Sequence, residues 1–161
     1  MVKIGFHLNP MAAALKHTTI HIHGGKIAFL GKATIGKGNM FKSEGYIEFG
    51  NNFYSQQDCV FWCKEKIIIG QDVLCGWNVM LRDHDGHTLY KDGIEKPEHK
   101  PISVGDHVWL CSEVNVMKGA VIQEDSVVAY KSLVTKAIGE PHALIAGIPA
   151  KTVQTNIEWS R

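Results

Sequence analysis

The segment from Val104 to Ile138 reads VGDHVWLCSEVNVMKGAVIQEDSVVAYKSLVTKAI, and its core-type residues recur at intervals of six. One register comprises Val104, Leu110, Val116, Ile122, Val128 and Val134. A second register, four positions further on, comprises Val108, Val114, Ala120, Ser126, Ser132 and Ile138. An α-helix repeats at about 3.6 residues and a β-strand at 2, so neither produces a sustained period of six. The period predicts a parallel β-helix, a solenoid in which each coil shares its core with the coils above and below.

The six-residue spacing recurs earlier in the chain, with two eight-residue steps and one long interruption. Positions six apart are Phe49, Ser55 and Phe61, and then Ile69, Cys75 and Leu81. The steps from Phe41 to Phe49 and from Phe61 to Ile69 are eight residues long, which indicates a bulged corner. The period then stops over residues 82–103, a polar stretch that contains two glycines and two prolines. Long loops in compact domains are uncommon and tend to be functional, so this loop is the candidate active-site segment.

The chain of 161 residues is expected to form one domain. We expect an N-terminal cap at residues 1–17, early coils at 18–81, the active-site loop at 82–103, late coils at 104–139 and a C-terminal segment at 140–161. The formal net charge of +1 leaves no basic stripe, so nucleic acid is not expected as a partner.

The N-terminal stretch from Met11 to Leu15 is apolar, as in a signal peptide, but His7, Asn9 and Pro10 interrupt the run. We interpret it as a short helix or an irregular cap over the first coil, because the end of a solenoid must be covered. No apolar stretch is long enough to predict a membrane span.

The four cysteines, Cys59, Cys63, Cys75 and Cys111, include no C-x-x-C pair. Their spacing fits stacked hexapeptide positions better than a zinc site, so we interpret them as small core or corner residues. Reduced thiols indicate a cytoplasmic protein.

Four segments between residues 45 and 153 match, in order and spacing, the motifs of a known family. They read FGNNFY at 49–54, IGQDVL at 69–74, VGDHVWL at 104–110, and SLVTK at 132–136 followed by AGIPAK at 146–151. In these motifs the chain resembles the hexapeptide-repeat acyltransferases, within them the maltose and galactoside O-acetyltransferase branch with its sugar and capsule relatives. The resemblance implies an all-β, left-handed parallel β-helix, although parallel crossovers are normally right-handed.

The resemblance also implies direct transfer of acetyl from acetyl-CoA to a hydroxyl group. Such a transfer needs a base that takes the hydroxyl proton, and imidazole suits this task at neutral pH. One branch of the family carries its base in a D-x-D-x-H motif, which Asp83, Asp85 and His87 match. We therefore predict His87 as general base, with Asp85 or Asp83 orienting its ring or contacting the acceptor. His84 is the alternative base, and a hydrophilic loop with incidental histidines is the alternative to both.

In the family, the pantetheine arm of acetyl-CoA lies along the coil between two subunits, and basic residues lie near its nucleotide end. The residues that match the cofactor-binding positions, or that are expected to line the groove, are Trp109, Ser112, Tyr130, Thr135, Lys136 and Lys151. Lysines suit phosphate groups as compact charges. The alternatives are that both lysines are merely solvated, and that Trp109 only covers the coil surface.

The resemblance implies a saccharide acceptor, of the surface polysaccharide type, bound by Tyr54, Gln56 and Trp77. The galactoside and maltose enzymes have N-F-Y-x-N where this chain has NFYSQ at 52–56, and a D-D pair where it has Cys63-Lys64. A galactoside or maltose acceptor should therefore not be assumed. The aromatic residues are alternatively explained by packing between subunits.

The resemblance further implies a homotrimer with active sites between subunits, and no metal. Two other classes of protein use the same coil. Metal-dependent proteins like carbonic anhydrase need three histidines on one zinc, and the candidates here are His84, His87 and His107. A non-catalytic coil that serves as a scaffold is the third alternative.

Overall fold

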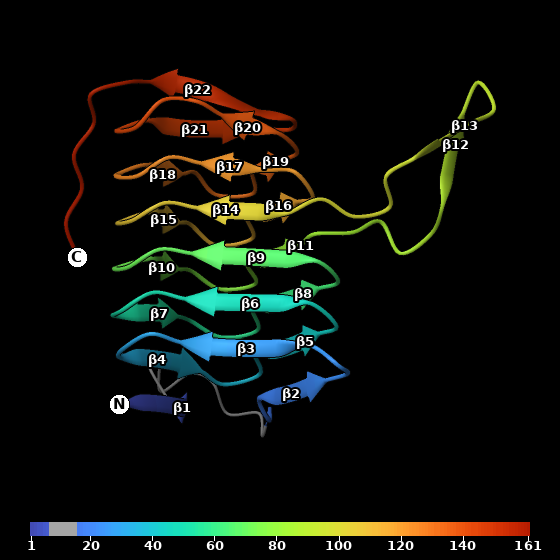
Figure 1. Ribbon diagram of the computed structural model, residues 1–161. Helices are drawn as coiled ribbons and strands as arrows, with labels where there is room; N and C mark the ends of the chain where they lie inside the picture. The colour runs from blue at the N-terminus through green and yellow to red at the C-terminus, as the bar shows by residue number, and fades with distance from the viewer. Residues whose placement is uncertain (7–15) are drawn as a thin grey trace.

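The computed structural model describes residues 1–6 and 16–161, and within these ranges the chain is all-β, without a helix. The coils stack on one another, and their parallel strands line up into three faces of the solenoid (Figure 1). Face I contains β1 (Val2–Phe6), β4 (Ala33–Gly36), β7 (Phe53–Ser55), β10 (Leu74–Cys75), β15 (Trp109–Leu110), β18 (Val127–Val128), β21 (Leu144–Gly147) and the antiparallel β22 (Ala150–Gln154). Face II contains β2 (Thr19–Ile22), β5 (Met40–Ser43), β8 (Val60–Cys63), β11 (Met80–Arg82), β16 (Asn115–Met117) and β19 (Leu133–Val134). Face III contains β3 (Lys26–Phe29), β6 (Tyr46–Phe49), β9 (Lys66–Ile69), β14 (Ile102–Val104), β17 (Val121–Ile122) and β20 (Ala137–Ile138).

The coil is left-handed, as the resemblance implies. In Figure 1 the chain climbs from β1 at the bottom to β22 at the top. The strands of face III lie in front and run from right to left, and the chain returns behind them through faces I and II. The predicted left-handed β-helix is therefore confirmed.

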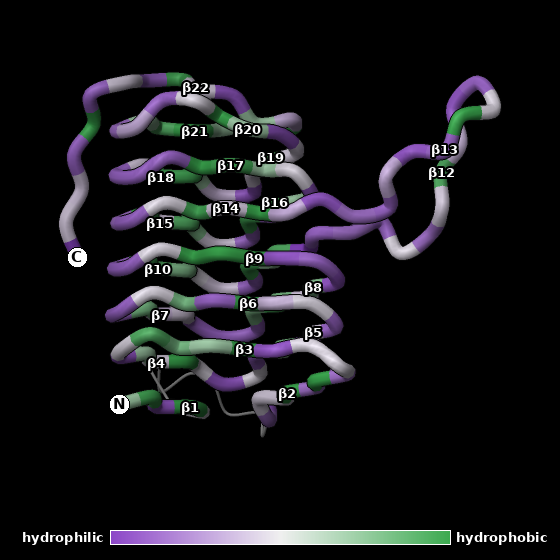
Figure 2. The backbone as a smooth tube through the Cα atoms, in the orientation of Figure 1, coloured by the Kyte–Doolittle hydropathy of each residue, from purple (hydrophilic) through white to green (hydrophobic). Residues whose placement is uncertain are grey.

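Both six-residue registers point into the core. Every one of their twelve residues is buried, with at most 6% of its surface exposed. Figure 2 shows apolar colour along many of the strands and hydrophilic colour at many of the corners between them. The coil thus buries the residues that the hexapeptide period selects, because equivalent positions of successive coils lie on top of one another.

The core of the first coils is aromatic, and phenylalanine rings of successive coils stack on one another. Phe61 lies 5.0 Å from Phe41 and 5.2 Å from Phe49, and Phe29 lies 4.8 Å from Phe49, all between ring centroids. These separations are typical of favourable aromatic pairs. The core becomes aliphatic in the later coils.

The two eight-residue steps fall at the same corner, between faces II and III. Tyr54 pairs with Leu74, so an early coil takes 20 residues, whereas Trp109 pairs with Val127 and a later coil takes 18. The long loop is inserted at this same corner, between β11 and β14. It forms a hairpin of β12 (Leu89–Lys91) and β13 (Ile94–Lys96), which projects away from the coil (Figure 1).

The two ends of the chain contact the coil differently. Residues 2–6 form β1, which pairs with β4, so this part of the expected N-terminal cap is a strand rather than a helix. Residues 7–15, which include His7, Asn9, Pro10 and the Met11–Leu15 stretch, lie outside the described residues. The last residues run back along the outside of the coil beside face I (Figure 1). The described residues contain no helix that is long and apolar enough to cross a membrane.

Candidate active site

Asp83, one of the predicted catalytic residues, is buried at the root of the loop. Its carboxylate accepts backbone N–H bonds from Lys64, Glu65 and Lys66, each at 2.8 Å, and a longer contact from the Cys63 thiol at 3.4 Å. A carboxylate that accepts several backbone N–H bonds stabilises the turn that presents them. Asp83 therefore holds the corner of the preceding coil.

Asp85 lies two residues further on and is partly exposed. Its carboxylate accepts a hydrogen bond from the ammonium group of Lys118, and its backbone N–H donates to the carbonyl of Glu98 at 2.9 Å. The orientation of His87 by Asp85 stays a prediction.

His84, the alternative base, is fully buried. Its ring lies edge-on to Trp62, with 4.7 Å between centroids, and neither ring nitrogen has a hydrogen-bond partner among the described residues. Burial lowers the pKa of His84 below its ordinary value of 6.5, and the Arg82 guanidinium lowers it further. The imidazole is thus kept neutral inside the loop root.

The lowered pKa of His84 predicts that the fold loses stability in mild acid. The unfolded chain binds a proton near pH 6.5 that the folded chain takes up only at lower pH, so stability falls as pH drops below 6.5. We expect urea titrations to give a lower free energy of unfolding at pH 5 than at pH 7. His84→Gln should reduce this difference, whereas the exposed control His21→Gln should preserve it; an unchanged difference in His84→Gln would contradict the assignment.

His87, the predicted base, is exposed on the outgoing arm of the loop. The hydrogen bonds and ion pairs of the described residues do not include its side chain. The imidazole is therefore free to meet a hydroxyl group from outside this chain.

One cavity brings together most of the predicted binding residues. It has a volume of about 360 Å³ and opens at the corner between faces I and II. Its lining comprises Gln56, Leu74, Gly76, Trp77, Trp109, Cys111, Ser112 and Tyr130. Two predicted acceptor residues and three predicted cofactor residues thus share a single hollow.

Hydrogen bonds order the polar part of this cavity. The Ser112 hydroxyl oxygen accepts the backbone N–H of Trp77 at 3.1 Å, which leaves its own proton free to donate. The Tyr130 hydroxyl donates to Glu113 at 2.7 Å and holds the exposed ring at the rim. Gly76 is required here, because a Cβ at that position would lie 2.6 Å from the Ser112 nitrogen.

The remaining predicted residues lie elsewhere. Lys136 and Lys151 line a second cavity of about 440 Å³ between β20 and β22, and Thr135 is exposed directly before Lys136. Tyr54 lies on the outer side of β7, outside both cavities, with the Arg161 guanidinium 5.4 Å from its ring centroid.

Three residues near the cavity and the loop were not predicted from the sequence as site residues: Cys111, Lys118 and Trp159. Cys111 lines the cavity, and its place next to Ser112 was the available signal. Trp159 lies 5.9 Å from Trp109 between ring centroids. Nothing in the local sequence indicates that the end of the chain folds back over face I, since that contact depends on the tertiary structure.

The cysteines are free and mostly buried, as their spacing predicted. Burial raises the pKa of both Cys59 and Cys63 to about 12, and it raises that of Cys75 well above its usual range. Cys111 is only partly buried, although burial raises its pKa too.

These environments predict that iodoacetamide labels the native protein first at Cys111, because the other thiols are inaccessible and protonated at neutral pH. The measurement is peptide mass spectrometry after timed labelling at pH 7.5. Urea should expose all four cysteines, and Cys111→Ser should remove the fast native site. Fast labelling of Cys63 or Cys75 in the native state would contradict the burial of these side chains.

His107, a candidate metal ligand, lies at a different corner from the loop. Its Nδ1 lies 2.9 Å from an oxygen of Asp125, and its ring stacks on Trp159 with 4.1 Å between centroids. The described residues contain no group of three or more ligating side chains that could hold a metal ion.

Comparison with known proteins finds acetyltransferases. A putative acetyltransferase of Schizosaccharomyces pombe is 35% identical over 111 residues, which are 67% of this chain and 52% of that protein. The galactoside O-acetyltransferase of Escherichia coli K12 is 32% identical over 110 residues, 67% of this chain and 53% of that protein. The polysialic acid O-acetyltransferase of Escherichia coli O1:K1 is 36% identical over 100 residues, 61% of this chain and 32% of that protein. The chain therefore spans about half the length, or less, of these relatives.

Solved structures share the fold. A maltose O-acetyltransferase of Clostridium difficile is 26% identical with a TM-score of 0.62, and covers 89% of this chain and 70% of its own. A galactoside acetyltransferase solved with coenzyme A is 22% identical with a TM-score of 0.62, and covers 99% of this chain and 72% of its own. No protein-family model matches the sequence. The ordered motifs, the left-handed coil and these relatives together show that the chain belongs to the hexapeptide-repeat acyltransferase family.

Proposed function

We propose that the protein transfers an acetyl group from acetyl-CoA to a hydroxyl group of a saccharide, of the surface polysaccharide type. The observation that carries this proposal is the cavity that gathers Trp109, Ser112 and Tyr130 with Gln56 and Trp77. The names of the relatives support it, since they include galactoside and polysialic acid O-acetyltransferases. Solved relatives that hold coenzyme A or acetyl-CoA support the choice of donor.

His87 acts as general base in this proposal. Its imidazole takes the proton of the acceptor hydroxyl while the hydroxyl oxygen forms a bond to the thioester carbonyl carbon. Backbone N–H groups stabilise the negative charge that develops on the carbonyl oxygen. The carbon–sulfur bond then breaks, and His87 returns the proton to the departing sulfur. The products are the acetyl ester and coenzyme A.

Lys136 and Lys151 are assigned to the phosphate groups of the donor. Both line the second cavity near the C-terminal end of the coil, where their ammonium groups supply positive charge. The free thiols support the proposal of a reducing compartment, the cytoplasm.

The active site is assigned to the interface between subunits of a homotrimer. The base lies on a loop at the corner between faces II and III, whereas the cavity opens at the corner between faces I and II. None of the residues that line the cavity comes from the loop. A neighbouring subunit would supply the missing half of the site.

The trimer is tested by light scattering coupled to gel filtration. We expect a mass three times the 17.9 kDa of one chain. A monomer at the concentration of the activity assay would overturn the shared site, whatever the activity.

The activity is tested by calorimetry followed by an acceptor screen. We expect acetyl-CoA to bind with micromolar affinity, and coenzyme A to be released when a suitable oligosaccharide is added. Mass spectrometry should find an alkali-labile acetyl ester on the acceptor. No binding at millimolar acetyl-CoA would overturn the proposal and favour a scaffold. Stoichiometric zinc in protein purified without added metal would instead favour a metal-dependent β-helix protein that resembles carbonic anhydrase.

A further inference from the structure

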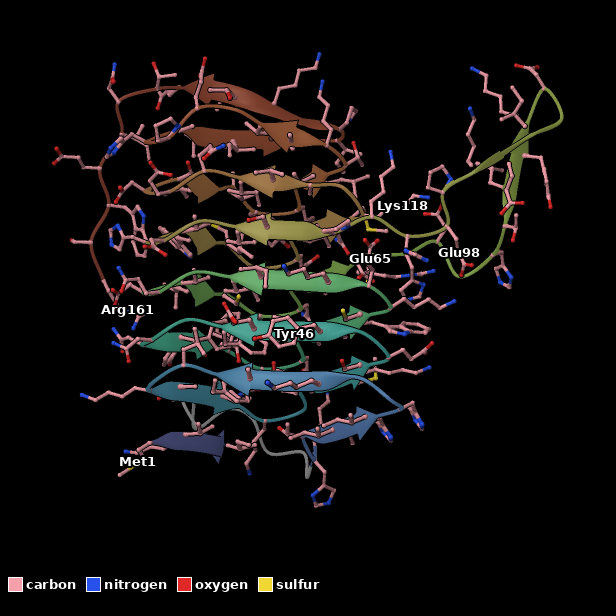
Figure 3. All side chains as sticks on the ribbon, in the orientation of Figure 1. Met1, Tyr46, Glu65, Glu98, Lys118 and Arg161 are labelled. Carbon is pink, nitrogen blue, oxygen red and sulfur yellow. The ribbon has the colours of Figure 1, made fainter. Side chains whose placement is uncertain are left out.

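Lys118 follows β16, and its ammonium group reaches the place where the hairpin leaves the coil. It donates to the Asp85 carboxylate, to the carbonyl of Pro97 at 2.5 Å and, at a longer 3.4 Å, to the carbonyl of Glu98. Only 20% of the side chain is exposed. Figure 3 shows Lys118 and Glu98 at this junction between coil and hairpin.

These three oxygen atoms belong to both arms of the loop. Asp85 lies on the outgoing arm, and Pro97 and Glu98 lie on the returning arm. The arms also bond directly, because the Asp85 N–H donates to the carbonyl of Glu98 and the Lys100 N–H to that of Asp83, both at 2.9 Å. Lys118 therefore ties a short antiparallel ribbon to the next coil of the solenoid.

Asp85 is held through each of its polar groups. Besides its N–H and its carboxylate, its carbonyl accepts a hydrogen bond from the Arg82 guanidinium. Gly86 follows with a φ of +88°, a conformation that favours glycine, and His87 comes next. The backbone before His87 is thus clamped up to the residue where the chain turns.

Other ion pairs at the junction hold only the returning arm. Lys64 bonds Glu98 at 2.5 Å, and Glu65 lies 2.8 Å from a ring nitrogen of His99. Neither reaches the arm that carries His87. Lys118 is distinguished by joining the two arms to the coil at once.

We propose that Lys118 is a positioning residue for the catalytic loop, which sets the direction in which His87 leaves the coil by anchoring Asp85 and the returning arm together. This inference rests on the proposed function of His87. In this inference the Asp85 carboxylate binds the Lys118 ammonium group and does not orient the imidazole of His87.

The test compares Lys118→Met with wild-type protein and with Lys118→Arg. Methionine keeps the apolar stem and removes the ammonium group, so we expect kcat to fall about 10- to 100-fold through misplacement of the base. The affinity for acetyl-CoA should stay within about twofold, because Lys118 does not line either cavity. Lys118→Arg should recover part of kcat. The control Lys16→Met, which removes the ion pair with Asp58 in the first coils, should keep wild-type kcat.

A double variant and hydrogen exchange separate positioning from general stability. Asp85→Asn combined with Lys118→Met should lower kcat no further than the stronger single variant, because both substitutions disrupt the same contact, between the Asp85 carboxylate and the Lys118 ammonium group. The amides of Asp85 and Lys100 should exchange faster in Lys118→Met, while those of the coil strands keep wild-type rates.

The outcomes distinguish this inference from the proposed function. Unchanged loop exchange in Lys118→Met overturns the inference, whether or not the wild-type protein is active. Wild-type kcat in Lys118→Met also overturns it. Faster loop exchange in a protein whose wild-type form transfers no acetyl group supports the clamp and overturns the proposed function.

Discussion

His87→Ala lowers the kcat of acetyl transfer by about 10² to 10⁴ if His87 is the general base, because the alanine variant cannot take the hydroxyl proton. Binding of acetyl-CoA should be retained, since His87 lies outside both cavities and has no partner among the described residues. Initial rates of thiol release measure the first effect and calorimetry measures the second. The expected result is a catalytic loss without a binding loss.

His84 provides the matched comparison. Its ring is buried against Trp62, so His84→Ala should act on stability more than on the chemical step. Thermal unfolding of both variants shows which losses come from an unfolded fraction. If His84→Ala abolishes activity in a folded protein while His87→Ala retains it, the assignment of the base is wrong.

Asp83→Ala destabilises the fold by about 3 to 5 kcal/mol, because it removes a buried carboxylate and leaves three backbone N–H groups without their acceptor. Those donors belong to Lys64, Glu65 and Lys66, at the corner from which the loop emerges one coil later. Urea denaturation measures the change in the free energy of unfolding. The loss should be accompanied by faster hydrogen exchange at the three amides.

Asp106→Ala is the control for this prediction. Asp106 also accepts a backbone N–H, from Gln71 at 2.9 Å, but it is exposed, so water can replace it. We expect a loss of less than about 1 kcal/mol. If Asp83→Ala keeps wild-type stability and loses kcat, Asp83 is a catalytic residue, as the D-x-D-x-H motif suggested, and not a support of the corner.

In the loop, residues that belong to one sequence motif lie in three different environments. Asp83 is buried, Asp85 is bonded to Lys118 and His87 is exposed. A motif states only that these residues are close in sequence. Their partners Lys64 and Lys118 come from preceding and following coils, so the pairs depend on how coils stack.

The residues predicted to bind the substrates were easier to group from the sequence, because they occupy repeated positions of the coil. Gln56, Trp77, Ser112 and Tyr130 follow four successive strands of face I, and stacking places them along one corner. Tyr54 departs from this set, because side chains alternate along a strand and Tyr54 faces outward from β7.

The β-helix, its buried registers and the position of the loop could be predicted from the hexapeptide period, because a coil with a fixed repeat maps intervals in sequence directly onto layers in space. The groups that the loop contacts and the packing of the chain end depend on the tertiary structure. Lys118 reaches Asp85 across 33 positions, and Trp159 reaches His107 across 52. Such contacts depend on the irregular path of a hairpin and a tail, for which no repeat in the sequence sets a register.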